Sequence, residues 1–286
     1  MVHTTTGCSK PFAIFVLLVT IFMHGCRSQK SREDDRTYLV VITQYQLNVD
    51  EDGSFEALGF GGKNYDEPTE VHVNGVPVIR LDGGGTVVPI SDCLRKGKNE
   101  VTVSNISQNR LFIYVADAPK NWMTEGKSFR LGEIDGSSGE SEDNSIEFQV
   151  DKNWTGPRFE ALNEEEKSPE SVRMVISELV DLASAREGAL FFNQIARGQD
   201  VTAKREGFEG MFAEAKKDFT DHINKAEKKC KLNEYHISNA KNGLLISGDP
   251  AIEIDELWIQ SLSIVKLNGE LVIWRVFSAL EKDEGQ

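Results

Sequence analysis

Hydrophobic residues alternate with polar ones in short runs between residues 37 and 151. These runs are rich in β-branched and aromatic side chains, as β-strands are. We expect strands at 38–42, 54–58, 70–73, 76–79, 86–88, 100–103, 111–115 and 145–150. Pairs such as Asp52-Gly53 and Asn74-Gly75 separate the runs and supply the positive φ angles of tight turns. No periodic run of helix length interrupts them, so the pattern predicts an all-β sandwich.

After residue 167 the apolar positions recur every three or four residues. The Ser-Pro-Glu sequence at 168–170 is typical of a helix start, with a serine N-cap and a proline at the first helical position. The first apolar stripe predicts a helix that continues to about residue 196 and ends at Arg197-Gly198. A second stripe covers 208–230, and Gly207 and Gly210 predict a break at its front.

The apolar spacing changes to two after residue 232. The alternation predicts strands at 235–238, 243–247, 256–265 and 270–277. Asn268-Gly269 joins the last two runs and is a strong hairpin signal. Helices followed by antiparallel strands make an α+β unit. Both faces of the last predicted strand carry large apolar side chains. We therefore expect this strand to be covered on both faces and Trp274 to lie in the core.

Polar segments divide the chain into units. Residues 26–36 are typical of a short flexible stalk. The polar residues between 120 and 144 predict a mobile surface loop, and those at 152–167 predict a linker. The expected order is therefore a signal peptide at 1–25, the stalk, a β-sandwich domain at 37–151, the linker, and an α+β domain at 168–281.

The N-terminus predicts export. The apolar run from Phe12 to Met23 is shorter than the roughly 20 residues that cross a bilayer, but its length suits a signal peptide. It is followed by Gly25-Cys26, which resembles the bacterial lipobox, where a small residue precedes a cysteine that is diacylated and becomes the mature N-terminus. The resemblance implies lipidation of Cys26 and a periplasmic or outer-membrane lipoprotein. Cleavage by ordinary signal peptidase, which would give a secreted protein, and an uncleaved anchor are the alternatives.

The turns of the first unit resemble those of the galactose-binding-like jelly-roll module. The resemblance is carried by Val71–Gly75, Gly83–Gly85, Pro89–Leu94 and Lys96–Val103. In that module a strand ending in Asn-Gly precedes a displayed loop, and a turn with a leucine, a basic residue, Gly and Asn opens the next strand. The resemblance implies a jelly-roll-like shape and, as a further expectation, carbohydrate binding through the loops.

The second unit resembles the cone-shaped NTF2-like (SnoaL-like) domain. The order of two helices and then strands carries the resemblance over 168–280, and the terminal hairpin Ser-Ile-Val-Lys-Leu-Asn-Gly-Glu-Leu-Val-Ile-Trp-Arg at 263–275 carries it by residues. The family has a pocket between a concave sheet and its helices, and its dehydratases and isomerases place an Asp, Tyr or His there for proton transfer. The resemblance makes Asp221, His222, Tyr235 and His236 candidates for such groups.

Composition and charge narrow the choice of partners. The chain has 286 residues, 39% hydrophobic and 27% charged, which suits globular domains. Its 46 acidic and 32 basic residues give a net charge of −14, which disfavours a nucleic-acid partner because phosphate backbones are repelled. Two cysteines of the mature chain, Cys93 and Cys230, make no disulfide framework. A buried thiol at Cys230 on the second helical stripe is expected, with a disulfide to Cys93 as the alternative.

No motif identifies a reaction, a metal site or a cofactor. Asn48–Gly53 places oxygen ligands on alternate residues like the front half of a calcium loop, but the twelfth position is Gly59 instead of glutamate, so a hairpin turn is expected. His72 lies between two valines and is expected on the solvated face of its strand. No histidine is spaced from another as metal ligands are, and no serine lies in a nucleophile elbow.

The sequence therefore favours a non-enzymatic function. We expect an exported, membrane-tethered envelope protein that binds or scaffolds a small ligand or another envelope protein. A carbohydrate- or small-ligand-binding lipoprotein is the first alternative. A proton-transfer enzyme of the NTF2-like class is the second. A deep polar pocket that holds two of the four candidate side chains would favour the enzyme, and a filled cone would favour scaffolding.

Overall fold

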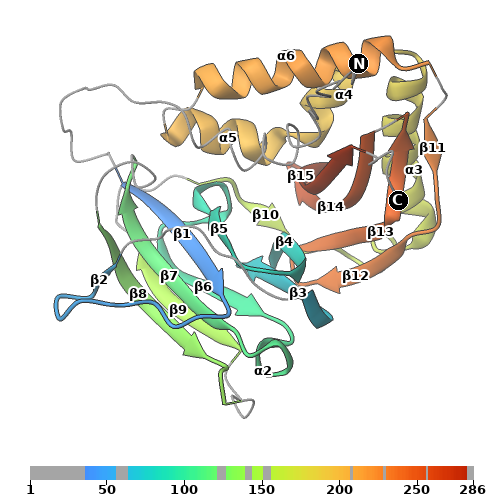
Figure 1. The fold of residues 1–286 in the computed structure, drawn as a ribbon. Coiled ribbons are helices and arrows are strands. Elements are labelled where there is room, and N and C mark those ends of the chain that lie inside the picture. The colour runs from blue at the N-terminus through green and yellow to red at the C-terminus, as the bar shows by residue number, and fades with distance from the viewer. Residues whose placement is uncertain are drawn as a thin grey trace, which may run out of the picture.

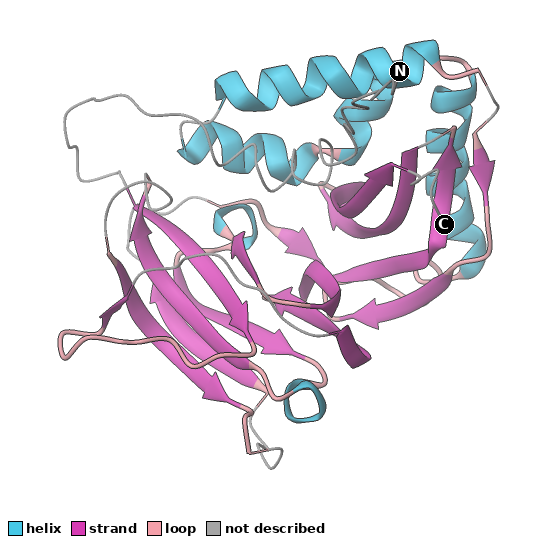
Figure 2. Ribbon diagram, viewed as in Figure 1, coloured by secondary structure: helices cyan, strands magenta, loops and turns pink. Residues whose placement is uncertain are grey.

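The computed structural model describes residues 36–55, 64–120, 127–138, 144–150, 156–206, 209–227, 230–255 and 257–281. The expected signal peptide, Cys26 and all of the expected stalk except Arg36 lie outside these residues. Figure 1 shows two units in contact, a β-sheet unit and a unit of helices over a second antiparallel sheet. Figure 2 shows that strands dominate the first unit, whereas the second unit combines helices and strands.

The first unit has β-sandwich-like sheets, as the sequence predicts. One antiparallel sheet has the order β2-β8-β7-β1-β5, and the other has the order β4-β3-β6-β9. The strands are β1 (Arg36–Thr43), β2 (Ser54–Phe55), β3 (Asn64–Val73), β4 (Val76–Gly83), β5 (Thr86–Pro89), β6 (Gly97–Val103), β7 (Phe112–Pro119), β8 (Ser128–Asp135) and β9 (Ser145–Val150). A short 3-10 helix η1 (Ser91–Cys93) and a four-residue helix α2 (Ile106–Asn109) connect strands.

Both faces of the central strand β1 are buried. Val40 and Ile42 belong to the core between the two sheets, while Leu39 and Val41 belong to a smaller cluster on the other face. The chain after β1 covers that outer face, because Leu47 packs against the smaller cluster and its N–H donates to the Tyr114 hydroxyl at 3.2 Å. This double burial explains why the strand is almost continuously apolar.

The second unit has helices followed by an antiparallel sheet, which confirms the α+β prediction. The helices are α3 (Pro169–Ser184), α4 (Gly188–Ile195), α5 (Arg197–Glu206) and α6 (Glu209–Lys225). The strands are β10 (Phe159–Glu160), β11 (Lys231–Leu232), β12 (His236–Ala240), β13 (Gly243–Ile254), β14 (Leu257–Leu267) and β15 (Glu270–Glu281). β13 is central: β11 and β12 pair along one edge and β14 along the other, and β15 pairs with β14.

The predicted single helix up to residue 196 is wrong, because the chain breaks it after Ser184. Arg186 has a φ of +61°, which no α-helix accommodates, and Gly188 starts a new helix. A Cβ at Gly188 would lie 2.5 Å from the Thr220 carbonyl oxygen, so glycine lets α4 approach α6 closely. The N-terminal start is as predicted, since the Ser168 hydroxyl accepts the Ser171 N–H at 3.2 Å.

Two further helix boundaries differ from the sequence analysis. A helix ends near residue 196 as expected, because α4 ends at Ile195, but Arg197 and Gly198 then begin another helix, α5. Cys230 does not lie on the second helix, because α6 ends at Lys225, yet its side chain is buried in the same apolar core. Gly207, where a break is expected, lies outside the described residues: α5 ends at Glu206, and α6, which includes Gly210, begins at Glu209.

The polar stretch at 120–144 is not only a surface loop. Its described part contains β8, which pairs with β7 from Asp117↔Phe129 to Phe112↔Asp135. Backbone pairing does not need an apolar pattern, and β8 has few buried side chains, so its sequence carries little strand signal. Gly132 permits the close approach of Ile146, whose Cγ2 would lie 2.2 Å from an added Cβ.

The expected linker at 152–167 contributes to the second unit. Its described part contains β10, whose Phe159 and Glu160 pair with Leu267 and Lys266 of β14. Leu162 is 6% exposed and lies in the apolar core of that unit. The chain therefore joins the second sheet before its first helix starts.

Candidate functional site

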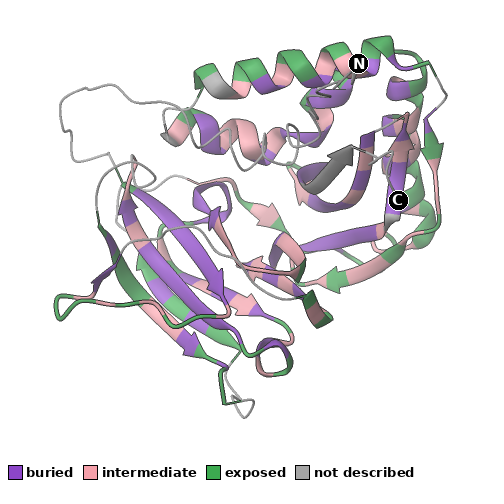
Figure 3. Cartoon of the chain, in the orientation of Figure 1, coloured by how far each residue is buried: buried purple, intermediate pink, exposed green. Residues whose placement is uncertain are grey.

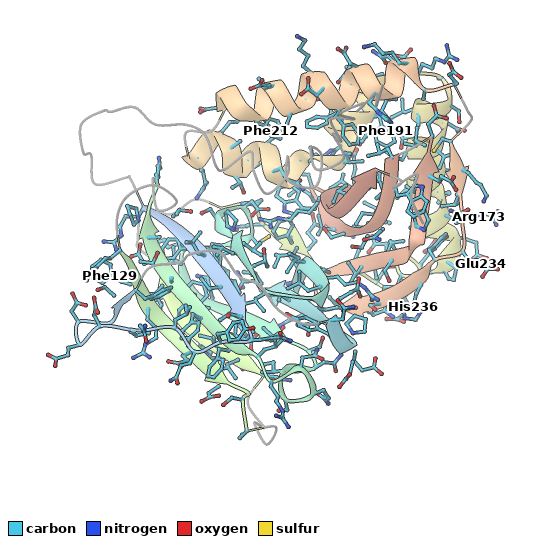
Figure 4. All side chains as sticks on the ribbon, in the orientation of Figure 1. Phe129, Arg173, Phe191, Phe212, Glu234 and His236 are labelled. Carbon is cyan, nitrogen blue, oxygen red and sulfur yellow. The ribbon has the colours of Figure 1, made fainter. Side chains whose placement is uncertain are left out.

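The four side chains considered for proton transfer lie on different elements. Asp221 is exposed on α6, and its neighbour His222 is half-buried there. Tyr235 packs against the apolar core, whereas His236 is exposed at the start of β12. Figure 4 shows His236 at the outer edge of the second sheet, away from α6, the helix that carries Asp221 and His222. None of the four lines the cavities described below, and their roles stay predictions.

Apolar side chains fill the space between the helices and the sheet of the second unit. From the helices come Val172, Ile176, Leu179, Phe191, Phe192, Phe219 and Ile223, and from the strands Leu244, Ile246, Ile252, Ile259, Leu262, Ile264 and Ile273. Phe191 and Phe219 stack with their ring centroids 5.8 Å apart. Figure 3 shows this space lined by buried residues, and Figure 4 shows Phe191 and Phe212 pointing into it. These side chains form an apolar core, with a cavity at its side toward α5 that is described below.

The contact between the two units contains a buried ion pair. Asp92 in η1 is fully buried and Arg275 in β15 is 6% exposed. The Arg275 Nε donates to Asp92 Oδ2 at 2.7 Å, its Nη2 donates to Asp92 Oδ1, and Nη2 also reaches the Pro89 carbonyl oxygen at 2.8 Å. This forked geometry satisfies both charges, which burial would otherwise penalise by several kcal/mol.

Trp274 completes this contact. Its indole Nε1 donates to Asp92 Oδ2 at 2.8 Å, and its ring packs edge-on against Phe159 with the centroids 5.0 Å apart. The side chain is 2% exposed and, with Val265 and Val272, belongs to the core of the first unit. The expectation that Trp274 is buried is therefore confirmed, but its partners come from the sandwich as well as from its own unit.

Gly198 allows α5 to cover the buried carboxylate. A Cβ at this position would lie 2.7 Å from Asp92 Oδ2 and 2.8 Å from the Trp274 Nε1, so a larger residue would collide with the ion pair.

Cys93, next to Asp92, is a free thiol, and burial raises its pKa well above its ordinary value. Cys230 is also free and buried, and burial raises its pKa to about 12. The buried thiol is confirmed at Cys230, and no disulfide links the two.

Two hairpin turns meet at the edge of the contact. The Asn242 Nδ2 donates to the Asn74 carbonyl oxygen at 2.6 Å, and the Asn242 N–H donates to the Gly75 carbonyl oxygen at 2.9 Å. The Asn74 side chain bonds within the sandwich, because its Nδ2 donates to the Cys93 carbonyl oxygen and to Asn99 Oδ1. The Asn-Gly turn that resembles a displayed sugar-binding loop is thus packed against the other unit.

A second polar contact involves Glu70, His72 and Ser238. The Ser238 hydroxyl donates to Glu70 Oε1 at 3.2 Å, and His72 Nε2 lies 3.4 Å from Glu70 Oε2. Burial favours a raised pKa at Glu70, but His72, Ser238 and Arg80 outweigh it and lower the pKa below 4.5. The carboxylate lies between the serine and the histidine, so this is not a nucleophile relay. His72 is half-buried, which corrects its expected position on a solvated face.

A cavity of about 600 Å³ opens beside these contacts. Its walls are Asn74, Cys93, Arg95 and Lys96 from the sandwich, and Gly156, Pro157, Arg158, Phe159 and Asn242 from the second unit. We name it the junction cavity. A second cavity of about 540 Å³ lies between α4, α5, α6 and the β14–β15 hairpin. There the basic groups are already engaged, since Lys204 pairs with Asp200 at 2.5 Å and Lys216 donates to Asn193 at 2.6 Å.

Sequence reasoning missed Asp92, Arg275 and the basic lining of the junction cavity. The ion pair joins residues 183 positions apart, which no local period reveals. The available signal was an arginine within an otherwise apolar strand, since a charge there requires a partner.

Within the described ranges, no group of three or more His, Cys, Asp or Glu side chains is placed to hold a metal ion. Among the described helices, none is long and apolar enough to cross a membrane. Asp50 and Asp52, considered as calcium ligands, both accept a hydrogen bond from the Ser54 hydroxyl and form the expected turn.

In comparisons with known proteins, no family model matched the chain, and no significant match was found to a curated protein or a solved structure.

Proposed function

We propose that this chain is an exported lipoprotein, anchored to a membrane of the cell envelope through Cys26, whose two-unit body binds a ligand or another envelope protein. The apolar run before Gly25-Cys26 and the polar residues after it support the anchor and the stalk. The described body supports binding over catalysis.

One observation carries the binding role: a cavity of about 600 Å³ lies open where the units meet, with walls from both units. The second cavity, between the helices and the β14–β15 hairpin, is lined by none of the four side chains considered for proton transfer. An enzyme of the cone class needs a chamber with polar groups for proton transfer. The candidates Asp221 and His236 are exposed on separate elements instead. The proton-transfer alternative therefore has less support than binding.

We also infer that the second unit is an NTF2-like cone. Helices precede all strands of this unit except the two-residue β10, and β14 and β15 curve beneath α4 and α5 in Figure 1. Register shifts at 259–264 in the β14–β15 pair support this curvature, because bulges bend a strand. The hairpin turn at Asn268-Gly269, with both residues at positive φ, is the one that the resemblance predicts.

The anchor is tested by labelling cells with a fatty-acid analogue and separating membranes from soluble fractions. Cys26→Ser should lose the label and the mature membrane-bound form, because the acyl acceptor must be a thiol. Cys8→Ser is the matched control, since it removes the other cysteine of the N-terminal segment and should keep both. Equal labelling of the Cys26→Ser and unchanged chains would refute the lipid anchor.

Binding of a small ligand in the junction cavity is the more specific form of the proposal. About 600 Å³ is within the range of small-molecule sites, roughly 300–1,000 Å³. The sugar-binding alternative through the Asn74-Gly75 turn has less support, because that turn is occupied by Asn242.

A further inference from the structure

The lining of the junction cavity has the opposite charge to the chain as a whole. Arg95, Lys96 and Arg158 line it, and among the described residues no acidic side chain does. The whole chain has 46 acidic and 32 basic residues. A cavity walled by one sign of charge concentrates ligands of the other sign.

These three basic groups are available to a ligand. The Arg95 Nε donates to the Lys98 carbonyl oxygen at 3.1 Å, which orients the guanidinium and leaves its terminal nitrogens without a partner among the described residues. Within the same described ranges, the Lys96 and Arg158 side chains take part in no ion pair or hydrogen bond, and both are exposed at the cavity wall. Guanidinium groups of this kind bind carboxylate, sulfonate or phosphate oxygens through two parallel hydrogen bonds.

The remaining walls fit an apolar body. Phe159 and Pro157 line one side, and Phe159 is held in place by its edge-on contact with Trp274. Asn242 also lines the cavity, and its Nδ2 is committed to the Asn74 carbonyl oxygen. Its Oδ1 has no partner among the described residues, so it can accept a hydrogen bond from a ligand hydroxyl or N–H.

Both walls of the cavity are held in position before any ligand arrives. The buried Asp92–Arg275 pair lies next to Cys93 on one wall, and the Asn74–Asn242 contact closes the edge. A Cβ at Gly75 would lie 2.7 Å from the Lys241 Cβ, which shows how tightly the two turns meet. Binding to such a site costs less ordering entropy than binding to a mobile one.

We propose that the junction cavity binds a small organic anion: a carboxylate, sulfonate or phosphate ester with an apolar, ring-sized body. This inference rests on the proposed binding role and names its ligand class. Arg95, Lys96 and Arg158 bind the anionic group, and Pro157 and Phe159 contact the body.

The probe is anilinonaphthalenesulfonate, which carries one sulfonate on an aromatic body and fluoresces when it leaves water. N-phenylnaphthylamine is the matched neutral probe, with nearly the same rings and no anionic group. Both are titrated into residues 27–286, the mature chain without the anchored Cys26, which contain every described residue. The sulfonate probe should bind at one site and more tightly than the neutral one.

The double variant Lys96→Gln/Arg158→Gln should weaken binding of the sulfonate probe about tenfold or more. It should leave binding of the neutral probe unchanged. Lys98→Gln is the matched control, because Lys98 belongs to the same loop but pairs with Glu147 at 2.5 Å, away from the cavity. Equal melting temperatures of the two variants and the unchanged chain show that the fold is kept.

Unchanged affinity for the sulfonate probe in the folded double variant would overturn the inference, as would an equal loss for both probes. The result is separable from the anchor experiment. Loss of the label at Cys26 with no charge-dependent probe binding would support the anchor and overturn only the ligand class. Charge-dependent probe binding without labelling at Cys26 would support the ligand class and overturn only the lipid anchor.

Discussion

The second sheet makes two contacts of different chemistry, one with its own helices and one with the sandwich. The helix contact consists of apolar side chains such as Ile176, Phe191 and Ile246. The sandwich contact combines the apolar Val265 and Val272 with a buried ion pair. An apolar contact is non-directional and tolerates adjustment, whereas a buried ion pair is stable only if both partners keep their geometry.

The two contacts should respond differently to the loss of a single side-chain group. Removing a methyl group from the helix contact leaves a small cavity, and the remaining side chains still attract one another. Removing one charge from the sandwich contact leaves the other charge buried and unpaired. The junction between the units should therefore be the more sensitive of the two contacts to single substitutions.

Trp274→Ala should have the largest effect. The side chain is 2% exposed, packs on Phe159 and donates to Asp92, so its removal creates a cavity and removes one hydrogen bond from the buried carboxylate. We expect a loss of about 3–5 kcal/mol in the free energy of unfolding, measured by denaturant titration of the mature chain. Ile176→Val in the helix contact is the comparison and should cost about 0.5–1.5 kcal/mol. If both variants lost the same stability, the two contacts would not differ as described.

Breaking the Asp92–Arg275 ion pair should cause the second-largest loss of stability. Asp92→Asn and Arg275→Met each leave a buried charge without its partner, and each should cost about 3–5 kcal/mol. The double variant should cost clearly less than the sum, because it removes both charges. Denaturant titration of the four proteins gives the coupling energy. Simple additivity would mean that the pair contributes no interaction of its own.

Much of the fold could be predicted from apolar periodicity. Most strands, the N-cap at Ser168 and the hairpin at Asn268-Gly269 follow from local patterns, because burial of one face repeats along each element. The predictions were wrong where the local pattern was weak. β8 forms through backbone pairing with β7, and the helix break at Arg186 depends on a single positive φ.

The junction could not be predicted in the same way. Asp92 and Arg275 are far apart in sequence, and nothing near either residue indicates the other. The junction cavity combines residues from the loop at 93–96, from 156–159 and from the turn at Asn242, so it exists only once both units are in contact. Candidate residues chosen by chemical type, such as His236, were not placed together by the fold.

A smaller effect is expected at the Glu70 contact, which also joins the units. Its folded-state pKa is lowered, so its contribution to stability is present above its ordinary value of 4.5 and is lost as the pH falls through the folded-state pKa. Glu70→Gln should cost up to about 1.5 kcal/mol at neutral pH. The difference between the two proteins should shrink as the pH is lowered below 4.5. Unfolding curves at several pH values test this, and a constant difference down to acid pH would contradict it.

The smallest effects are expected at the exposed candidates for proton transfer. Asp221 and His236 are exposed, His236 on β12 and Asp221 on α6, and no ion pair among the described residues holds either one. Asp221→Asn and His236→Ala should therefore each change the free energy of unfolding by no more than about 0.5 kcal/mol. They should also leave binding of the sulfonate probe unchanged, because neither residue lines the junction cavity. Loss of probe binding in either variant, with stability unchanged, would move the binding site from the junction to the second unit and reverse the comparison between the two contacts.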